Sequence, residues 1–539
     1  MFSCPLIRFS GVLYNKLVKY ERLIFLLFLL IALFQVWHTR FVPSLDGPQH
    51  LYNANVLAEL IKGNELVGSY FKVNDMLVGY WAGHFFLTLF KLFLPAWLAE
   101  KMVLTLYIVG FVFSFRYLVK SLNPDRGNFI LYLSFPFVFH FYFAMGYYSF
   151  SIAAIFFFLA FGYWIRHEDK RGFRYILIFG LLTFSIFLSH AFVFVLFGMA
   201  FLLYLLGGII HDKLVFDSEK WIRNALLKLF KAAVAVLPAI VFWVIYIRSV
   251  MEVNDMVTEG SSGTAELIRF ILRIRPLVGF HHQLESPAYI LLFAVIALLV
   301  LIFLFQFITG LRQQHFRWPE ILSRKNLWIS VALIFLGCYF FAPDRISAGN
   351  LTHRFGLFLF FAVIVWLSTI RFPREIHMIT LVLVLVSFVY ARKVHHDFIG
   401  RLNDDVQQIR ELSAHVEPNT VMHYQRTSPN WLHRHFPLYV AVDQPVVHLM
   451  NQQCRGQFPV EWNLDALPRS FADSSEIIPS GAIMQSDRKY KTQNIDYVVV
   501  FRDDLFWNDS TNQNWIRILQ EHYEEVAVSS GGRASLWRN

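Results

Sequence analysis

The chain has 539 residues, of which 56% are hydrophobic and only 16% are charged, and its formal net charge is +10. A soluble protein of this length carries roughly a quarter charged residues, so the composition excludes an ordinary soluble globular protein and indicates a chain embedded mainly in lipid. The basic residues gather in short loops between apolar runs, which is typical of membrane topology rather than nucleic-acid binding, and three widely spaced cysteines exclude a disulfide framework and a zinc site.

The N-terminal segment carries Arg8, Lys16, Lys19 and Arg22 ahead of an apolar run that ends near Trp37. No small-residue cleavage site follows, so we expect an uncleaved first transmembrane helix rather than a signal peptide. A spanning helix needs about 20 apolar residues. The predicted spans are 22–39, 99–119, 129–146, 149–165, 173–189, 191–210, 226–250, 287–309, 327–342, 354–370 and 374–391.

The run 77–94 is ambiguous, because "LVGYWAGHFFLTLFKLFL" is apolar but contains glycines, a histidine and a lysine. If this run dips into the membrane without crossing it, all the basic loops fall on the cytoplasmic side with the N-terminus. We therefore predict an odd number of crossings, about 11 and at most about 13, with an exoplasmic C-terminus. The basic loops are 120–128, 166–174, 211–225, 311–326 and 371–374.

Beyond residue 391 the composition becomes polar. The stretch "VHHDFIGRLNDDVQQIRELSAHVEPNTVMHY" predicts a polar helix and then a short strand, "IDYVVVFRDD" a buried strand, "WIRILQEHY" a helix, and "EEVAVSS" with "ASLWRN" a closing hairpin. The predicted fold is an α-helical polytopic membrane protein with a C-terminal soluble α/β domain. The predicted domains are 1–391 in the membrane and 392–539 on the exoplasmic side.

Three loops are predicted to face outward and to form a site together: 40–76, 251–286 and 343–356. Such a site would lie at the outer boundary between membrane and water. An enzyme at that place acts on a lipid-attached substrate whose head group is polar and whose tail stays in the bilayer.

This order of elements resembles the GT-C glycosyltransferases, a superfamily that includes the protein O-mannosyltransferases and the aminoarabinose transferases of lipid A. "LDGPQHLYNANVL" resembles their first-loop signature, in which an acidic residue follows the first helix, and "VGYWAGHFF" resembles the start of a later helix. "GYYSFSIAAIFFFLAFGYWIR", "LTHRFGLFLFF", "HRHFPLYVAVDQP" and "FPVEW" are similar to stretches of a poorly characterised bacterial branch. The resemblance covers nearly the whole chain and implies a GT-C-like fold.

The chain departs from that family at one turn. Several members carry a second acidic residue where the third and fourth spans meet, but here the turn reads "AMGYYSFS". Asp75, which precedes the "GYW" run, is the reserve candidate for this acid. The Lys-Pro that often precedes the Tyr-Trp is also missing, so metal use and the identity of the donor stay open.

Asp46 is the predicted catalytic residue. An inverting sugar transfer needs a base beside the acceptor hydroxyl, and a loop carboxylate at the membrane boundary meets that need. The alternative is a simple helix N-cap, since Asp followed by Gly-Pro is a good helix start. His50 would turn to the same side of the helix and orient the carboxylate, contact a phosphate or join a metal site; otherwise it is a surface histidine.

Arg354, preceded by His353, opens a predicted span at the outer face. Arginine presents a planar fork that suits phosphate oxygens, so we expect it to bind a departing lipid phosphate, with Arg345 as a companion. The alternative is an arginine that snorkels to the interface.

A second group of basic residues lies in the loop 251–286: Arg273, Arg275, His281 and His282. These side chains would bind phosphate or sugar. An amphipathic interfacial helix over "ELIRFILRIR" explains the arginines equally well. The adjacent histidines do not share a helix face, so we predict no metal pair there.

Five further histidines have weaker signals. His84, His140 and His190 fall in or beside membrane spans, where polar groups are often functional but also form ordinary interfacial hydrogen bonds. His433 and His435 are predicted to share a strand face. Two ligands without a third make a poor metal site, so we favour a structural role for this pair.

The sequence thus predicts an integral membrane glycosyltransferase that moves a sugar from a polyprenyl-phosphate carrier to an exoplasmic glycan, lipid or protein with inversion. The alternatives are a transporter or flippase, or a non-catalytic scaffold. We expect a bacterial inner membrane location, no nucleic-acid partner and no required cofactor, although a divalent metal stays open.

Overall fold

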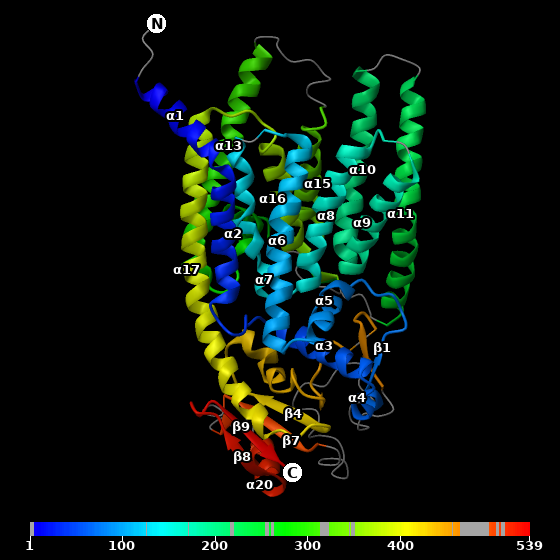
Figure 1. Ribbon diagram of the computed structural model, residues 1–539, viewed down its shortest axis with the longest axis vertical. Coiled ribbons are helices and arrows are strands. Elements are labelled where there is room, and N and C mark those ends of the chain that lie inside the picture. Colours follow the sequence, from blue (N-terminus) through cyan, green and yellow to red (C-terminus); the bar gives the residue numbers. More distant parts are fainter. Residues whose placement is uncertain are drawn as a thin grey trace. The chain divides into compact units, whose positions relative to one another are not determined.

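The computed structural model describes the chain except for residues 1–4, 126, 171, 216–219, 254–257, 260–262, 313–322, 344, 347–350, 455, 464–494, 503–505 and 508–512 (Figure 1). Arg126 and most of the basic loop 311–326 therefore lie outside the described residues. The chain divides into two compact units. The membrane unit comprises Met1–Gln35, Leu106–Ala144 and Phe150–His396, and the head unit comprises Val36–Thr105, Met145–Ser149 and Asp397–Asn539.

Long apolar helices dominate the membrane unit. Six helices are long and apolar enough to cross a bilayer by length and composition: α6, α8, α10, α11, α13 and α17. Three shorter apolar helices, α9, α15 and α16, pack among them, with α9 against α10 and α11 and α15 against α10 and α16 (Figure 1). The polytopic helical fold predicted from the sequence is confirmed.

The bounds of the described helices are α1 (Pro5–Lys19), α2 (Glu21–Trp37), α6 (Ala96–Leu122), α8 (Tyr148–His167), α9 (Phe173–Ser189), α10 (Ala191–Val215), α11 (Lys220–Val253), α12 (Thr264–Leu272), α13 (His282–Arg312), α15 (Leu327–Phe341), α16 (Leu351–Leu367) and α17 (Arg374–Leu412). The helix α17 joins the last predicted span and the polar helix after it without a break. The predicted boundary at residue 391 therefore falls inside one continuous helix.

The predicted span 129–146 is wrong as a single helix. It consists of two 3₁₀ segments, η1 (Phe129–Ser134) and η2 (Pro136–Phe139), followed by the short α7 (Phe141–Ala144). Pro136 has no N–H to donate, and His140 adopts an extended backbone between η2 and α7. Nearly all of these residues are buried. Irregular backbone at membrane depth is tolerated where protein surrounds it, and this segment meets that condition.

The ambiguous run 77–94 contains one short helix, α5 (Trp81–Lys91). Its 11 residues rise only about 16 Å at 1.5 Å per residue. The hydrocarbon core of a bilayer is about 30 Å thick, so α5 is too short to cross it. The helix length therefore agrees with a run that dips without crossing.

The head unit is built on a five-stranded sheet with the order β5-β4-β7-β9-β8. The strands β5 (Val446–His448), β4 (Thr420–Arg426) and β7 (Tyr497–Phe501) are parallel, and β9 (Ala534–Arg538) runs antiparallel to both β7 and β8 (Glu524–Val528). All five residues of β7 are buried, as its apolar run predicts. The predicted helix α20 (Gln513–His522) and the closing hairpin are also confirmed.

The first loop folds into this same unit. It forms α3 (Gly47–Ile61), α4 (Glu65–Tyr70) and β1 (Phe71–Val73), and β1 pairs antiparallel with β6 (Val460–Trp462). The 3₁₀ segment η5 (Trp431–Ala441) packs against α3. Residues near the two ends of the chain therefore form one body.

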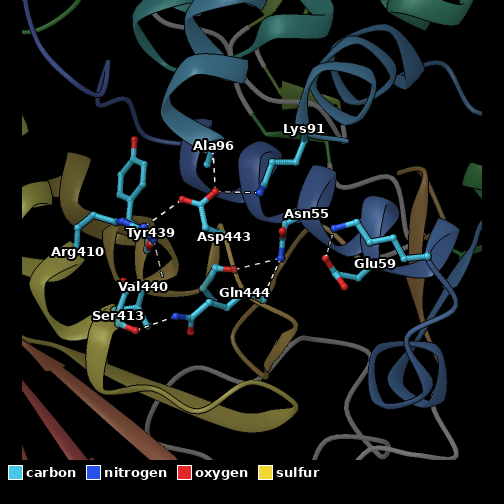
Figure 2. Close-up of polar contacts among 12 residues, drawn as sticks. Asn55, Glu59, Lys91, Ala96, Arg410, Ser413, Tyr439, Val440, Asp443 and Gln444 are labelled. Atoms are coloured by element: carbon cyan, nitrogen blue, oxygen red, sulfur yellow. Dashed lines mark hydrogen bonds and ion pairs between the residues drawn. The ribbon is translucent and has the colours of Figure 1, made fainter. Parts of the chain in front are cut away.

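Buried side chains of α3 bind the backbone of the C-terminal half of the chain. Asn55 Nδ2 donates to the carbonyl oxygens of Gln444 at 2.7 Å and of Ala441 at 3.2 Å (Figure 2). The Tyr52 hydroxyl donates to the Val446 carbonyl at 2.8 Å and accepts the His448 N–H at 2.7 Å. Because a buried polar group left without a partner costs about 1–3 kcal/mol, these bonds fix the place of α3 on η5 and β5.

Asp443 joins three elements at one carboxylate (Figure 2). Its Oδ1 lies 2.9 Å from Lys91 Nζ of α5 and accepts the backbone N–H of Ala96, the first residue of α6, at 2.8 Å. Its Oδ2 lies 3.0 Å from Arg410 Nη2 of α17. A negative charge at the N-terminus of α6 is favourable, and the two cations hold the pKa of Asp443 below its ordinary value.

We predict that Asp443→Ala lowers the free energy of unfolding by about 2–4 kcal/mol, because it leaves two part-buried cations without their partner. Thermal unfolding of the purified protein in detergent measures this effect. The matched control is Glu417→Ala, which removes an ion pair of the same 2.9 Å length to Arg538 whose two side chains are exposed. It should cost less than about 1 kcal/mol, and equal losses in the two variants would contradict the prediction.

Candidate active site in the first loop

Asp46 immediately precedes α3 and is its N-cap residue, with Pro48 in the first turn as the sequence predicts. Its side chain makes no capping hydrogen bond. The hydroxyl of Ser44 accepts the Gly47 N–H instead, at 3.2 Å. The carboxylate of Asp46 is thus not used to begin the helix, although its position is that of a cap.

The Asp46 carboxylate lies in a mostly buried place next to an imidazole. Its side chain is 18% exposed, and Oδ1 lies 3.7 Å from Nε2 of His435. Burial raises the pKa of Asp46 to about 7, and the positive charge of Arg434 opposes this shift. A general base works best when its pKa is near the working pH, so this carboxyl is suited to accept a proton at neutral pH.

The backbone before α3 is packed closely against the turn 145–149. The Asp46 N–H donates to the Met145 carbonyl at 2.9 Å. A Cβ on Gly47 would lie 2.3 Å from Ser44 Oγ and 2.7 Å from the Tyr148 hydroxyl, so only glycine fits there. The position of Asp46 is therefore set by tight backbone contacts on both sides.

His50 and His84 form a chain of hydrogen bonds that fixes both tautomers. His84 Nδ1 lies 3.1 Å from the Tyr80 carbonyl oxygen, which only accepts, so Nδ1 carries the hydrogen. Burial lowers the pKa of His84 to about 4, which leaves its Nε2 as an acceptor, 3.2 Å from His50 Nδ1. His50 therefore donates through Nδ1, and its Nε2 carries a lone pair.

The lone pair on Nε2 decides which kind of substrate group His50 can bind. Burial lowers the pKa of His50 well below its ordinary value, so the ring is neutral. A neutral ring in this tautomer offers an acceptor at Nε2, which suits a hydroxyl better than a phosphate oxygen. The described hydrogen bond of the His50 imidazole is to His84 and not to the Asp46 carboxylate.

Glu100 is a buried acid that the sequence analysis missed. Its Oε1 accepts the Tyr148 hydroxyl at 2.7 Å, and Oε2 accepts the Val42 N–H at 3.4 Å. Tyr148 belongs to the turn "AMGYYSFS", where an acid was expected from the resemblance but is missing in the sequence. A carboxylate therefore does reach this turn, from the start of α6.

In the membrane unit, Arg354 is 2% exposed, and its guanidinium lies over the rings of Tyr142, Phe150 and Phe192 at 5.3–5.5 Å. An arginine that snorkels to the surface would be exposed. The snorkelling alternative is therefore wrong for Arg354, which lies within an aromatic enclosure.

Two more of the predicted cations gather around Phe141, the neighbour of Tyr142. The guanidinium of Arg275 lies 5.5 Å from the Phe141 ring, and the ring of His353 lies 5.8 Å from it. The structure thus brings Arg275, His353 and Arg354 to the two aromatic residues at the start of α7. We call these three residues the cationic cluster.

The other candidate residues of the loop 251–286, Arg273, His281 and His282, have local partners. Arg273 Nη1 lies 3.3 Å from His282 Nε2, and the His281 N–H donates to the carboxylate of Glu285. The strands β2 (Thr258–Glu259) and β3 (Arg345–Ile346) pair antiparallel. This pairing joins two of the three loops that were expected to form a site, but the side chain of Arg345 lies outside the described residues.

Asp75, the reserve candidate for a second acid, is exposed in the loop after β1.

His140 and His190 accept nearby backbone N–H groups, those of Phe143 at 3.1 Å and Phe192 at 3.2 Å. These bonds fit the ordinary hydrogen-bonding role that was weighed for both histidines.

The expectation that His433 and His435 share a strand face is wrong, because both lie in the 3₁₀ segment η5. His433 contacts Asp405 at 3.2 Å and Ser428 at 2.8 Å, whereas His435 faces Asp46. Within the described ranges, no three His, Cys, Asp or Glu side chains come together as metal ligands.

No family model and no curated protein matches this chain. Solved structures that share its fold include two of ArnT from Cupriavidus metallidurans. The apo structure has a TM-score of 0.51 at 10% identity, and the structure bound to undecaprenyl phosphate has a TM-score of 0.50 at 11% identity. Each comparison covers 95% of this chain and 97% of ArnT. This likeness confirms that the chain has the same polytopic fold as ArnT.

We predict that Asp46 is protonated at about pH 5, where an aspartate of ordinary pKa near 4 is ionised, and loses its proton as the pH rises through about 7. Infrared difference spectra between wild type and Asp46→Asn should contain a carboxylic-acid carbonyl band at the lower pH that vanishes above neutrality. Asp75→Asn, which changes an exposed carboxylate, serves as the control. A band that disappears near pH 4 would show that burial does not raise the pKa of Asp46.

Proposed function

We propose that the protein is an integral membrane glycosyltransferase that moves a sugar from a polyprenyl-phosphate carrier to an exoplasmic acceptor, with inversion. The observation that carries this proposal is the Asp46 carboxylate, which is part-buried, makes no capping bond and has a pKa raised to about 7. A partly accessible carboxylate with a pKa near neutrality can act as a general base.

The likeness to ArnT supports the class of donor. One of the two ArnT structures holds undecaprenyl phosphate. A shared fold over nearly the full length of both chains makes a polyprenyl-phosphate partner the first to test here. The acceptor class, whether a glycan, a lipid or a protein, is part of the test.

In the proposed reaction Asp46 accepts the proton of an acceptor hydroxyl. The hydroxyl oxygen then forms a bond to the anomeric carbon of the sugar, and the bond from that carbon to the carrier phosphate oxygen breaks. Glu100 is a weaker candidate for the base, because it is fully buried and both of its oxygens accept hydrogen bonds from protein groups.

The carrier leaves as a polyprenyl phosphate, whose charge requires stabilisation. We propose that the cationic cluster of Arg275, His353 and Arg354 supplies it, with help from Arg345. The proposed location is the bacterial inner membrane, with the N-terminus in the cytoplasm and the head unit in the periplasm.

We predict that a strain without this gene lacks one sugar on a surface glycan, lipid or protein and accumulates the same sugar on its polyprenyl carrier. Wild-type protein should restore the transfer, and Asp46→Asn should leave at most about one per cent of it, since a general base contributes about 10²–10⁴-fold. Mass spectrometry of surface glycans and lipid-linked sugars measures both pools.

Glu65→Gln is the control, because it removes an exposed carboxylate of the same first loop, and it should restore transfer fully. Both variants must reach the wild-type protein level. Full restoration by Asp46→Asn would overturn the proposed mechanism. A deletion that changes the distribution of a lipid-linked sugar across the membrane without a missing glycan sugar would favour a flippase.

A further inference from the structure

No capping bond to α3 orients the Asp46 carboxylate. The side chain makes no capping hydrogen bond, and Ser44 takes the N–H that a capping aspartate would bind. Among the described residues, the side-chain partner of this carboxylate is His435 Nε2, at 3.7 Å. This partner comes from η5, in the C-terminal half of the chain.

His435 is as buried as a core residue. It is 3% exposed, and the next residues of η5, Phe436 and Leu438, are fully buried. Its Nδ1 is buried and has no hydrogen-bond partner in the described part of the chain. A buried polar atom without a partner destabilises the fold, so the fold alone does not account for a histidine here.

The spacing between His435 and Asp46 is fixed by bonds between the elements that carry them. Asn55, five residues beyond His50 on α3, binds the carbonyl of Ala441 at the end of η5. The helix α3 and the segment η5 therefore move as one body with both side chains.

We propose that His435 is the positioning residue of the base: its neutral imidazole donates a hydrogen bond from Nε2 to one oxygen of Asp46, so that the other oxygen faces the acceptor hydroxyl. This inference rests on the proposed function. The acceptor proton passes to Asp46, while His435 keeps its own proton throughout. The 3.7 Å separation shortens to hydrogen-bond length when the acceptor binds, as is common for catalytic contacts in unliganded enzymes.

The charge state of His435 agrees with this role. Burial, together with the nearby Arg434 and Arg426, lowers the pKa of His435 to about 3. The ring is thus neutral over the working pH range. Among the described residues, the titratable and charged groups that act on this pair are Arg434 and Arg426 on the C-terminal side and His50 on α3, whose own neighbour is His84 of α5.

The test uses the full-length protein in nanodiscs and, as donor, the lipid-linked sugar extracted from the deletion strain. We expect His435→Ala to lower kcat by about 10- to 100-fold, since misplacing a reactive group by about 1 Å costs up to 10²-fold. KM should stay within about threefold. The acidic limb of the pH profile should move up by about half to one unit, because the ionised form of Asp46 loses a hydrogen bond.

Two further variants separate positioning from folding. His435→Gln keeps an N–H donor near the place of Nε2 and should recover most of kcat and the wild-type pH profile. His433→Ala removes an equally buried histidine of η5 that contacts Asp405, so it should change thermal stability without moving the pH profile. In the Asp46→Asn background, His435→Ala should cause no additional loss, because the two residues act as a unit.

A His435→Ala variant with wild-type kcat and pH profile would overturn this inference while leaving the proposed function intact. The same holds if His433→Ala and His435→Ala shift the pH profile equally. If Asp46→Asn itself transfers sugar at the wild-type rate, Asp46 is not the base, and the role of His435 fails with it although sugar transfer stands.

Discussion

The hydrogen bonds between α3 and the C-terminal half of the chain determine where the candidate base lies. Asn55 and Tyr52 bind backbone carbonyls of residues near 441–446, and Asp443 joins α5, α6 and α17 at one carboxylate. Since these groups are largely removed from water, each unmade bond is costly. The first loop therefore folds with the C-terminal sheet into the head unit.

Two carboxylates of the head unit, those of Glu100 and Asp46, differ in their exposure and in their hydrogen bonds, and therefore in what they can do chemically. Glu100 has both oxygens bound by protein donors and is inaccessible. Asp46 keeps some exposure, makes no capping bond and faces a neutral imidazole. One acid is thus suited to hold the turn 145–149 in place, and the other is suited to exchange a proton with a substrate.

The sequence predicted those features that depend on local pattern. Apolar runs of membrane length, the buried strand β7 and the N-cap position of Asp46 follow from periodicity and from the Asp-Gly-Pro signal. The break in 129–146 was missed because its apolar composition hides the effect of Pro136 and of the extended His140.

Contacts between distant parts of the chain were not predictable in this way. Glu100 reaches Tyr148 across 48 positions, and no spacing rule connects Asp46 with His435. The packing of η5 against α3 decides that contact, whereas the sequence analysis placed His433 and His435 on one face of a strand. Tertiary packing, rather than local propensity, assembles this site.

In the proposed mechanism a single carboxylate base acts in one displacement at the anomeric carbon. The most direct measurement is the anomeric configuration of the sugar, by NMR, in the lipid-linked donor and in the product made by the wild-type protein. The account predicts the opposite configuration in the product. A retained configuration would contradict it, because a single back-side displacement inverts the anomeric carbon.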